Sequence, residues 1–281
     1  MDLATRLREE EFAAIRVQLE GGLRENILKS LDERGGAQEL VRQQYSGRYP
    51  FELLQNANDA AVDAGIRGRA YFLLTDSALI VADDGSGFGD RQVDAICSLG
   101  RSSKGPGTAV GHKGLGFKSV GEITDRPQVV SAQTSFQFDG ERLRREVLEL
   151  LRTLPAEQRF PVYAFPFPVA DVDLGSDAAQ VRRLQAEGFR TIIRLPLRDG
   201  VDRKTVAAHL VENLRPRLLL FLPGIDRLDL HGTRSDFTAT VVRREDGGAE
   251  HVVLDAGGEV EEWLILPQRG NSRPRRLGTA G

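Results

Sequence analysis

Phe51-Glu-Leu-Leu-Gln-Asn-Ala-Asn-Asp-Ala-Ala61 is the stretch that decides the fold, because it sets polar residues at helical spacing ahead of two glycine-rich turns. Glu52 and Asn56 are four residues apart, and Asn56 and Asp59 are three apart. All three side chains therefore lie on one face of a helix. The apolar residues between them form the opposite face, which packs on the core. Pro50 suits the first helical position, because the amide that it lacks would be unpaired there.

The polar face of this helix has groups that suit a metal ion and a phosphate. The side-chain oxygen of Asn56 can bind Mg²⁺, since this ion keeps most of its waters and takes one or two protein oxygens beside the phosphates. Glu52 is one turn away, where it can orient and deprotonate a water that attacks a γ-phosphate. Taken alone, the same face is also that of an ordinary solvated helix.

The first glycine-rich turn follows a predicted hairpin. Residues 70–74 and 78–82 are apolar runs joined by a short polar turn, which predicts two antiparallel strands. Asp83 comes directly after the second run, where its carboxylate can accept a hydrogen bond from the amino group of adenine. Gly85 and Gly87 leave room for the base to approach the backbone. The alternative is an ordinary hairpin turn.

The second turn, Gly111-His-Lys-Gly114-Leu-Gly116, has the composition of a phosphate-binding loop. Its glycine amides are unobstructed, and the helix predicted after it presents a positive N-terminus to an anion. Lys104, Lys113 and Lys118 can add positive charge. The turn is not a P-loop, because Phe117 stands where that motif has its lysine, and it is not a dinucleotide fingerprint, whose glycines come in the opposite order. Residues 100–111 are too rich in Gly, Ser and Lys to be regular and are predicted to form a mobile lid, with closure expected over 99–111.

In their order along the chain, these three pieces resemble the N, G1 and G2 boxes of the gyrase, Hsp90, histidine-kinase and MutL (GHKL) superfamily. Three short motifs are similar to those of the sacsin and NO VEIN-like Hsp90-type ATPases: Tyr45-Ser-Gly-Arg48, Ser102-Ser-Lys104 and Gly116-Phe-Lys-Ser119. The resemblance covers roughly residues 40–200. It implies the Bergerat fold, an α+β sandwich in which helices cover a mixed, largely antiparallel sheet and the nucleotide lies between the two.

The resemblance also implies a role for each matching residue. Glu52 is the general base, Asn56 the Mg²⁺ ligand and Asp59 a polar support near the nucleotide. Asp83 reads adenine, and Thr191, in a later predicted strand, shares a water with that aspartate and the base. The other nucleotide-binding residues that it implies are Gly85, Gly87, Lys104, Gly111, Lys113, Gly114, Leu115, Gly116 and Phe117. A basic residue that reaches the γ-phosphate from the next domain cannot be assigned from spacing.

The function expected from this resemblance is Mg²⁺-dependent binding and slow hydrolysis of ATP, with lid closure that drives rearrangement of a larger protein or of a homodimer. A histidine kinase is disfavoured, because all four histidines follow the first box. Two alternatives stay open: an ATP-sensing module without appreciable turnover, and a gyrase-like or MutL-like domain that acts on DNA. The net charge of -3 gives no global reason to expect nucleic acid.

The composition and length of the chain indicate its cellular compartment and its number of domains. A chain of 281 residues with 40% hydrophobic and 28% charged residues is typical of a globular protein, and no apolar run reaches the length of a membrane span. One cysteine, no visible secretory signal and no membrane span favour the cytoplasm. We expect an N-terminal helical segment over residues 1–40, the ATP-binding domain over 41–215 and the strand-rich start of a second domain over 216–281.

The rest of the chain gives coarser predictions. Residues 3–31 fit one or two amphipathic helices with a break at Gly21-Gly22, and Gly35-Gly36 is predicted as a second pause. Helices are expected after Gly116 and over 141–155 and 206–214. Residues 160–169, with three prolines, must be an edge strand or an extended loop. Strands are expected at the following places: 129–131, 134–138, 191–195, 218–222, 227–230, 237–242, 251–254 and 261–266.

Overall fold

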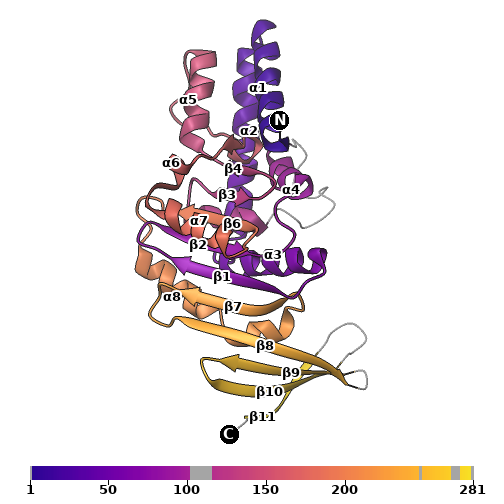
Figure 1. The fold of residues 1–281 in the computed structure, drawn as a ribbon. Helices are drawn as coiled ribbons and strands as arrows, with labels where there is room; N and C mark the ends of the chain where they lie inside the picture. The colour runs from indigo at the N-terminus through magenta and orange to yellow at the C-terminus, as the bar shows by residue number, and fades with distance from the viewer. Residues whose placement is uncertain (1, 102–115, 247–248, 267–272, 280–281) are drawn as a thin grey trace.

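A computed structural model describes residues 2–101, 116–246, 249–266 and 273–279 (Figure 1). The helices are α1 (Leu3–Glu20), α2 (Arg24–Gln44), α3 (Tyr49–Ala64), α4 (Asp90–Arg101), α5 (Gly140–Leu151), α6 (Asp171–Leu174), α7 (Ala178–Ala186) and α8 (Arg203–Asn213). Short 3₁₀ helices are η1 (Gly116–Glu122), η2 (Val162–Ala164), η3 (Gly175–Asp177) and η4 (Pro216–Phe221).

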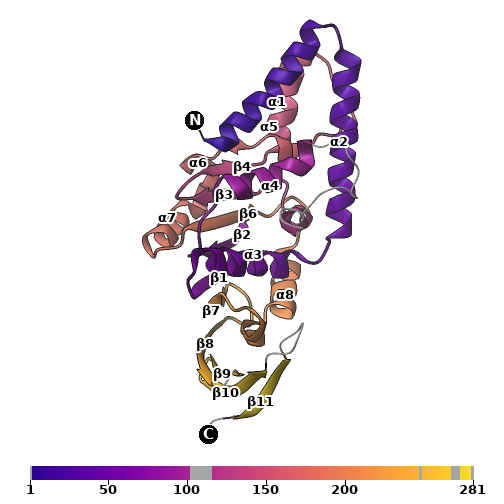
Figure 2. The ribbon, with the colours of Figure 1, turned by 90° about the vertical axis from the view of Figure 1, so that its right-hand side faces the viewer.

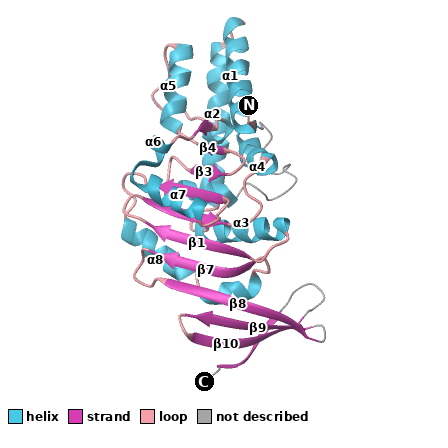
Figure 3. Ribbon diagram, viewed as in Figure 1, coloured by secondary structure: helices cyan, strands magenta, loops and turns pink. Residues whose placement is uncertain are grey.

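The strands form a single sheet of eleven in the order β11-β10-β9-β8-β7-β1-β2-β6-β3-β4-β5. They are β1 (Gly68–Leu74), β2 (Ala78–Asp83), β3 (Gln128–Ser131), β4 (Ser135–Gln137), β5 (Phe167–Pro168), β6 (Thr191–Pro196), β7 (Ile225–His231), β8 (Phe237–Asp246), β9 (Ala249–Ala256), β10 (Glu259–Leu266) and β11 (Arg273–Thr279). The pair β1–β7 is parallel, and the other described pairs are antiparallel. The predicted α+β class, with a mixed and largely antiparallel sheet and a strand-rich C-terminal region, is confirmed (Figure 3).

Strand β2 is buried on both faces, which explains its continuous apolar run. Leu79 and Val81 pack with the apolar face of α3 in the largest core cluster. Ile80 and Ala82 point the other way, into a second cluster with α7. Helices α3 and α7 therefore cover opposite faces of the sheet at this strand (Figure 2). The end of β2, where Asp83 lies, is fixed from both sides.

Helices α1, α2 and α5 rise from one end of the sheet and have a core of their own (Figures 1 and 2). Phe12 of α1 packs edge-on against Phe165, with 5.1 Å between the ring centroids. The predicted break at Gly21-Gly22 is confirmed, since α1 ends at Glu20 and α2 begins at Arg24. The predicted pause at Gly35-Gly36 is wrong, because α2 runs through both glycines. A Cβ at Gly35 would lie 2.6 Å from the backbone nitrogen of Phe160. Close packing, rather than a turn, therefore requires glycine at this position.

Two other predictions of local structure are corrected. Residues 218–221 lie in η4 and residue 222 follows it, so this run is not a strand. Pro216 at the start of η4 has the backbone angle of a helix, and a short apolar run does not by itself distinguish a strand from a buried helical turn. The helix predicted after Gly116 is the short 3₁₀ helix η1.

The strands after Pro216 continue the same sheet, because β7 lies beside β1. The short strand β5 is at the opposite sheet edge, as the prolines of 160–169 predict. The division into domains at residues 40 and 216 stays a prediction. In the described part of the chain, no helix combines the length and the apolar content that a bilayer crossing needs.

Candidate functional site

Helix α3 presents the three predicted polar side chains as its spacing requires. Leu53, Leu54 and Ala57 are buried against the sheet. The Glu52 side chain is 15% exposed, Asp59 is half-buried and Asn56 is exposed. The helix therefore has an apolar back and a polar face.

The turn after β2 packs directly onto α3. The amide of Ser86 donates to the carbonyl oxygen of Ala60 at 3.0 Å. A Cβ at Gly85 would lie 2.6 Å from the backbone carbon of Ala60, so only glycine allows this approach. Gly87 has a φ of 82°, in the left-handed region that favours glycine. These contacts hold the turn against the C-terminal half of the polar helix.

Replacing Gly85 by alanine is expected to lower the free energy of unfolding by about 1–3 kcal/mol, because the new Cβ meets backbone atoms that cannot rotate away. The matched control is Gly140→Ala, where the nearest atom is a Val162 methyl at 3.4 Å. Urea unfolding of both variants measures the difference. Equal stability of the two variants would show that the turn does not lie against α3.

Asp83 is buried at the end of β2, and its carboxylate is held from two sides. The amide of Gly85 donates to its Oδ1 at 3.0 Å. Thr191 lies opposite on β6, in register with Asp83, and its side chain also forms a hydrogen bond with the carboxylate. Burial raises the pKa of Asp83 to about 7, against the lowering effect of these hydrogen bonds. The sequence named both residues, and the structure brings them together.

Gly116 lies against the carboxylate of Glu52 at the other end of the polar face. A Cβ at this position would clash with Oε2 of Glu52. Phe117 is 2% exposed, and its ring meets that of Tyr163 edge-on at 6.3 Å. Any contact of Phe117 with a ligand would therefore come from its backbone. The other residues named for this turn and the lid, Lys104, Gly111, Lys113, Gly114 and Leu115, lie outside the described residues.

Lys118 does not face the polar helix surface, although its place after the glycine turn predicts an added positive charge near a phosphate. Its side chain is buried, with Nζ 5.3 Å from the centre of the Tyr163 ring. Nζ has no hydrogen-bond partner among the described residues. Burial lowers the pKa of Lys118 to about 7.

The buried amine predicts a pH dependence of stability. Because the pKa of Lys118 falls from 10.5 to about 7 on folding, the unfolded chain binds a proton between these values that the folded chain does not. The stabilising contribution is present above pH 10.5 and is lost as the pH falls toward 7. We expect wild-type stability to rise between pH 7 and 10 by more than that of Lys118→Met. Urea unfolding at several pH values measures this rise, with exposed Lys204→Met as the control; parallel curves for all three proteins would contradict it.

Two ion pairs at the site were not predicted from the sequence. Arg48 lies 3.1 Å from Oε1 of Glu52, at the spacing of four residues that brings side chains together on a helix. That spacing is the feature of the sequence from which this ion pair could have been predicted. Asp84, next to Asp83, binds the backbone amide and the guanidinium of Arg69 at the start of β1. Asp84 therefore anchors the hairpin, and Asp83 is the acid left at the site.

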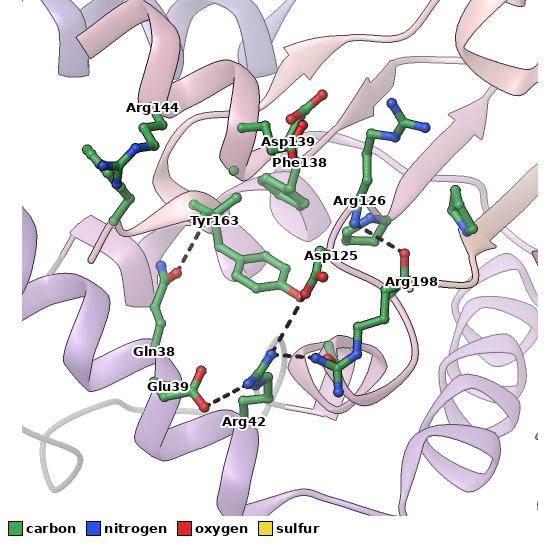
Figure 4. Close-up of a pocket in the computed structure, with 18 of the residues that line it drawn as sticks. Gln38, Glu39, Arg42, Asp125, Arg126, Phe138, Asp139, Arg144, Tyr163 and Arg198 are labelled. Atoms are coloured by element: carbon green, nitrogen blue, oxygen red, sulfur yellow. Dashed lines mark hydrogen bonds and ion pairs between the residues drawn. The ribbon is translucent and has the colours of Figure 1, made fainter. Parts of the chain in front are cut away.

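The structure also has a cleft of about 650 Å³, lined by both polar and apolar groups, Tyr163 among them (Figure 4). It is lined from α2, η2, the N-terminal end of α5 and the segments after η1 and β6. Arg42 in this cleft pairs with Glu39 and lies 3.9 Å from Asp125. None of the described residues that the sequence named for a nucleotide lines it.

The fold and the site define an α+β chain in which one helix carries a polar face between two glycine contacts, Gly85 at one end and Gly116 at the other. A scan against protein-family models found no match. The chain is similar to Protein NO VEIN of Arabidopsis thaliana, with 27% identity over 239 residues. The match covers 83% of this chain and 8% of that protein, so the chain spans a small part of its relative.

Proposed function

We propose that this chain is an ATP-binding and ATP-hydrolysing domain of the GHKL type, with a Bergerat fold. The observation that carries the proposal is the meeting of three separate sequence pieces on one helix. The turn after β2 contacts α3 at Ala60, and Gly116 contacts it at Glu52. Between these contacts lie the amide and the second acid of the polar face.

The chemistry of the residues supports a nucleotide at this place. Asp83 is a buried hydrogen-bond acceptor held by the Gly85 amide and Thr191. An acceptor in a fixed position suits recognition of the amino group of adenine. The Cβ-free surface of Gly116 leaves the carboxylate of Glu52 accessible to a small reactant beside it. In the proposed reaction, Glu52 accepts a proton from the attacking water, whose oxygen bonds to the γ-phosphorus as the bond to the ADP oxygen breaks.

The donor set fits Mg²⁺. Asn56 offers one exposed amide oxygen, and Mg²⁺ takes most of its ligands from water and phosphate oxygens. When bound, the ion would neutralise phosphate charge. Asn56 would hold it, and Asp59 would support the nucleotide beside it. The described residues contain no group of three or more histidine, cysteine, aspartate or glutamate side chains that could form a metal site made by protein ligands alone.

The test is isothermal calorimetry with Mg-ATP, followed by measurement of phosphate release. We expect binding of one ATP per chain and slow turnover. Binding without phosphate release would favour the alternative of an ATP-sensing module. Absence of binding to Mg-ATP and to Mg-ADP would overturn the proposal. Conformational change of a larger protein or of a homodimer is part of the proposal and rests on the lid predicted over 99–111. Residues 99–101 are the end of α4 rather than irregular lid, and residues 102–111 lie outside the described part of the chain.

A further inference from the structure

The contacts along α3 give the proposed nucleotide a direction. Gly85 and Ser86, beside the acceptor for adenine, touch α3 at Ala60. Gly116, on the phosphate side, touches it at Glu52. Glu52 and Ala60 are eight positions apart, which is about 12 Å of helix, since each residue rises 1.5 Å. The base therefore lies toward Ala60 and the γ-phosphate toward Glu52, and the next residue along this face is Arg48.

The guanidinium of Arg48 already lies where the γ-phosphate would end. It is 3.1 Å from Oε1 of Glu52, the carboxylate that orients the attacking water. Its side chain is 56% exposed, so it can reach a ligand in solvent. A guanidinium carries five N–H donors, so it can keep one contact with the carboxylate and offer others to phosphate oxygens.

The turn that carries Arg48 is held in a defined place. Its amide donates to the carbonyl oxygen of Tyr45 at 3.3 Å, and its guanidinium lies over the Tyr45 ring at 5.4 Å. Gly47, with a φ of 79°, donates its amide to the carboxylate of Glu122 at the end of η1. The turn is thus tied to the same short helix that starts at Gly116, so Arg48 is positioned before a nucleotide arrives.

We propose that Arg48 is a catalytic residue of the ATPase, supplying from within this chain the cation that contacts the γ-phosphate. The inference rests on the proposed function. In the reaction, the water oxygen bonds to the γ-phosphorus, its proton goes to Glu52, and the bond from phosphorus to the bridging oxygen breaks with its electron pair leaving on ADP. Arg48 donates hydrogen bonds to the non-bridging oxygens, whose charge must be neutralised in the transition state.

The test compares binding of ADP alone with binding of ADP plus aluminium fluoride, which imitates the transferring phosphoryl group. For Arg48→Ala we expect unchanged affinity for Mg-ADP, about 10-fold weaker binding of the aluminium fluoride complex and a similar fall in kcat, from the loss of a charge-assisted hydrogen bond. Arg48→Lys, which keeps the charge without the fork, is expected to lie between the alanine variant and the wild type. The matched control is Arg6→Ala, which removes an equally exposed arginine from another arginine–glutamate pair four residues apart.

The outcomes separate the two proposals. If the wild type binds neither Mg-ADP nor Mg-ATP, the proposed function fails. If the wild type hydrolyses ATP and Arg48→Ala matches Arg6→Ala in kcat and in affinity for the aluminium fluoride complex, the role of Arg48 is overturned while the function stands. Equal loss of affinity for ADP and for the aluminium fluoride complex also overturns it, because the arginine would then only support the ground-state site.

Discussion

Replacing Glu52 by alanine is expected to lower kcat for ATP hydrolysis by about 100- to 10,000-fold, the contribution of a well-placed general base. Binding of Mg-ATP should stay close to that of the wild type, because the carboxylate acts on water rather than on the nucleotide. The contacts of Glu52 would hold the proposed base in one orientation. Gly116 lies against one carboxylate oxygen, and Arg48 lies 3.1 Å from the other.

Phosphate release under single-turnover conditions measures this effect, with calorimetry for binding. The matched control is Asp63→Ala, which removes an exposed acid from the same helix. Hydrolysis by Glu52→Ala at the rate of the Asp63→Ala variant would show that Glu52 is not the base. Binding lost together with hydrolysis would show that the side chain holds the nucleotide or the fold.

Replacing Asp83 by asparagine is expected to weaken nucleotide binding itself, by about 10- to 100-fold in Kd, the value of a hydrogen bond to a charged acceptor. The Gly85 amide donates to Oδ1, so the asparagine oxygen takes that place and its NH₂ group turns toward the ligand. A donor then faces the amino group of adenine. Calorimetry with Mg-ADP measures the change, and Asp76→Asn in the exposed turn between β1 and β2 is the control. Equal affinities of the two variants would remove the adenine assignment.

The same residue predicts two pH dependences of opposite sign. Folding raises the pKa of Asp83 from 3.8 to about 7, so the folded chain binds a proton in this range that the unfolded chain has lost. Its stabilising contribution is present below pH 3.8 and disappears as the pH rises to 7. If the ionised Asp83 accepts from adenine as proposed, affinity for the nucleotide should increase as the pH rises through 7. Both trends should be absent in Asp83→Asn, and their persistence would assign them to another group.

Periodic patterns in the sequence were enough to predict most helices and strands. The helix over 51–61, the break at Gly21-Gly22 and the hairpin before Asp83 all have local signals, and each is found in the structure. The pause at Gly35-Gly36 was wrong because the reason for these glycines is a distant contact with residues 159 and 160. The strand predicted at 218–222 was wrong because a short apolar run can equally form a helical turn; Leu219, Leu220 and Leu222 are buried, but Phe221 is exposed.

Some features of the site could likewise be predicted from the local sequence, and others depend on tertiary contacts. The spacing of Glu52 and Asn56, and the place of Asp83 at a strand end, could be read locally. The inward orientation of Lys118 could not, because it depends on Tyr163, which is 45 residues further along the chain. Likewise, the contact between Gly116 and Glu52 depends on how η1 packs against α3.

The burial of β2 on both faces determines how readily its backbone amides exchange their hydrogens with solvent. A strand covered on both faces opens to hydrogen exchange only in large unfolding events, whereas a short 3₁₀ helix such as η1 can open locally. The base of the proposed nucleotide would be held by the slowly exchanging element and its phosphates by the more easily opened one. A bound nucleotide would then slow hydrogen exchange at η1 far more than at β2. The ligand would therefore stabilise η1, the less stable of the two elements that hold it.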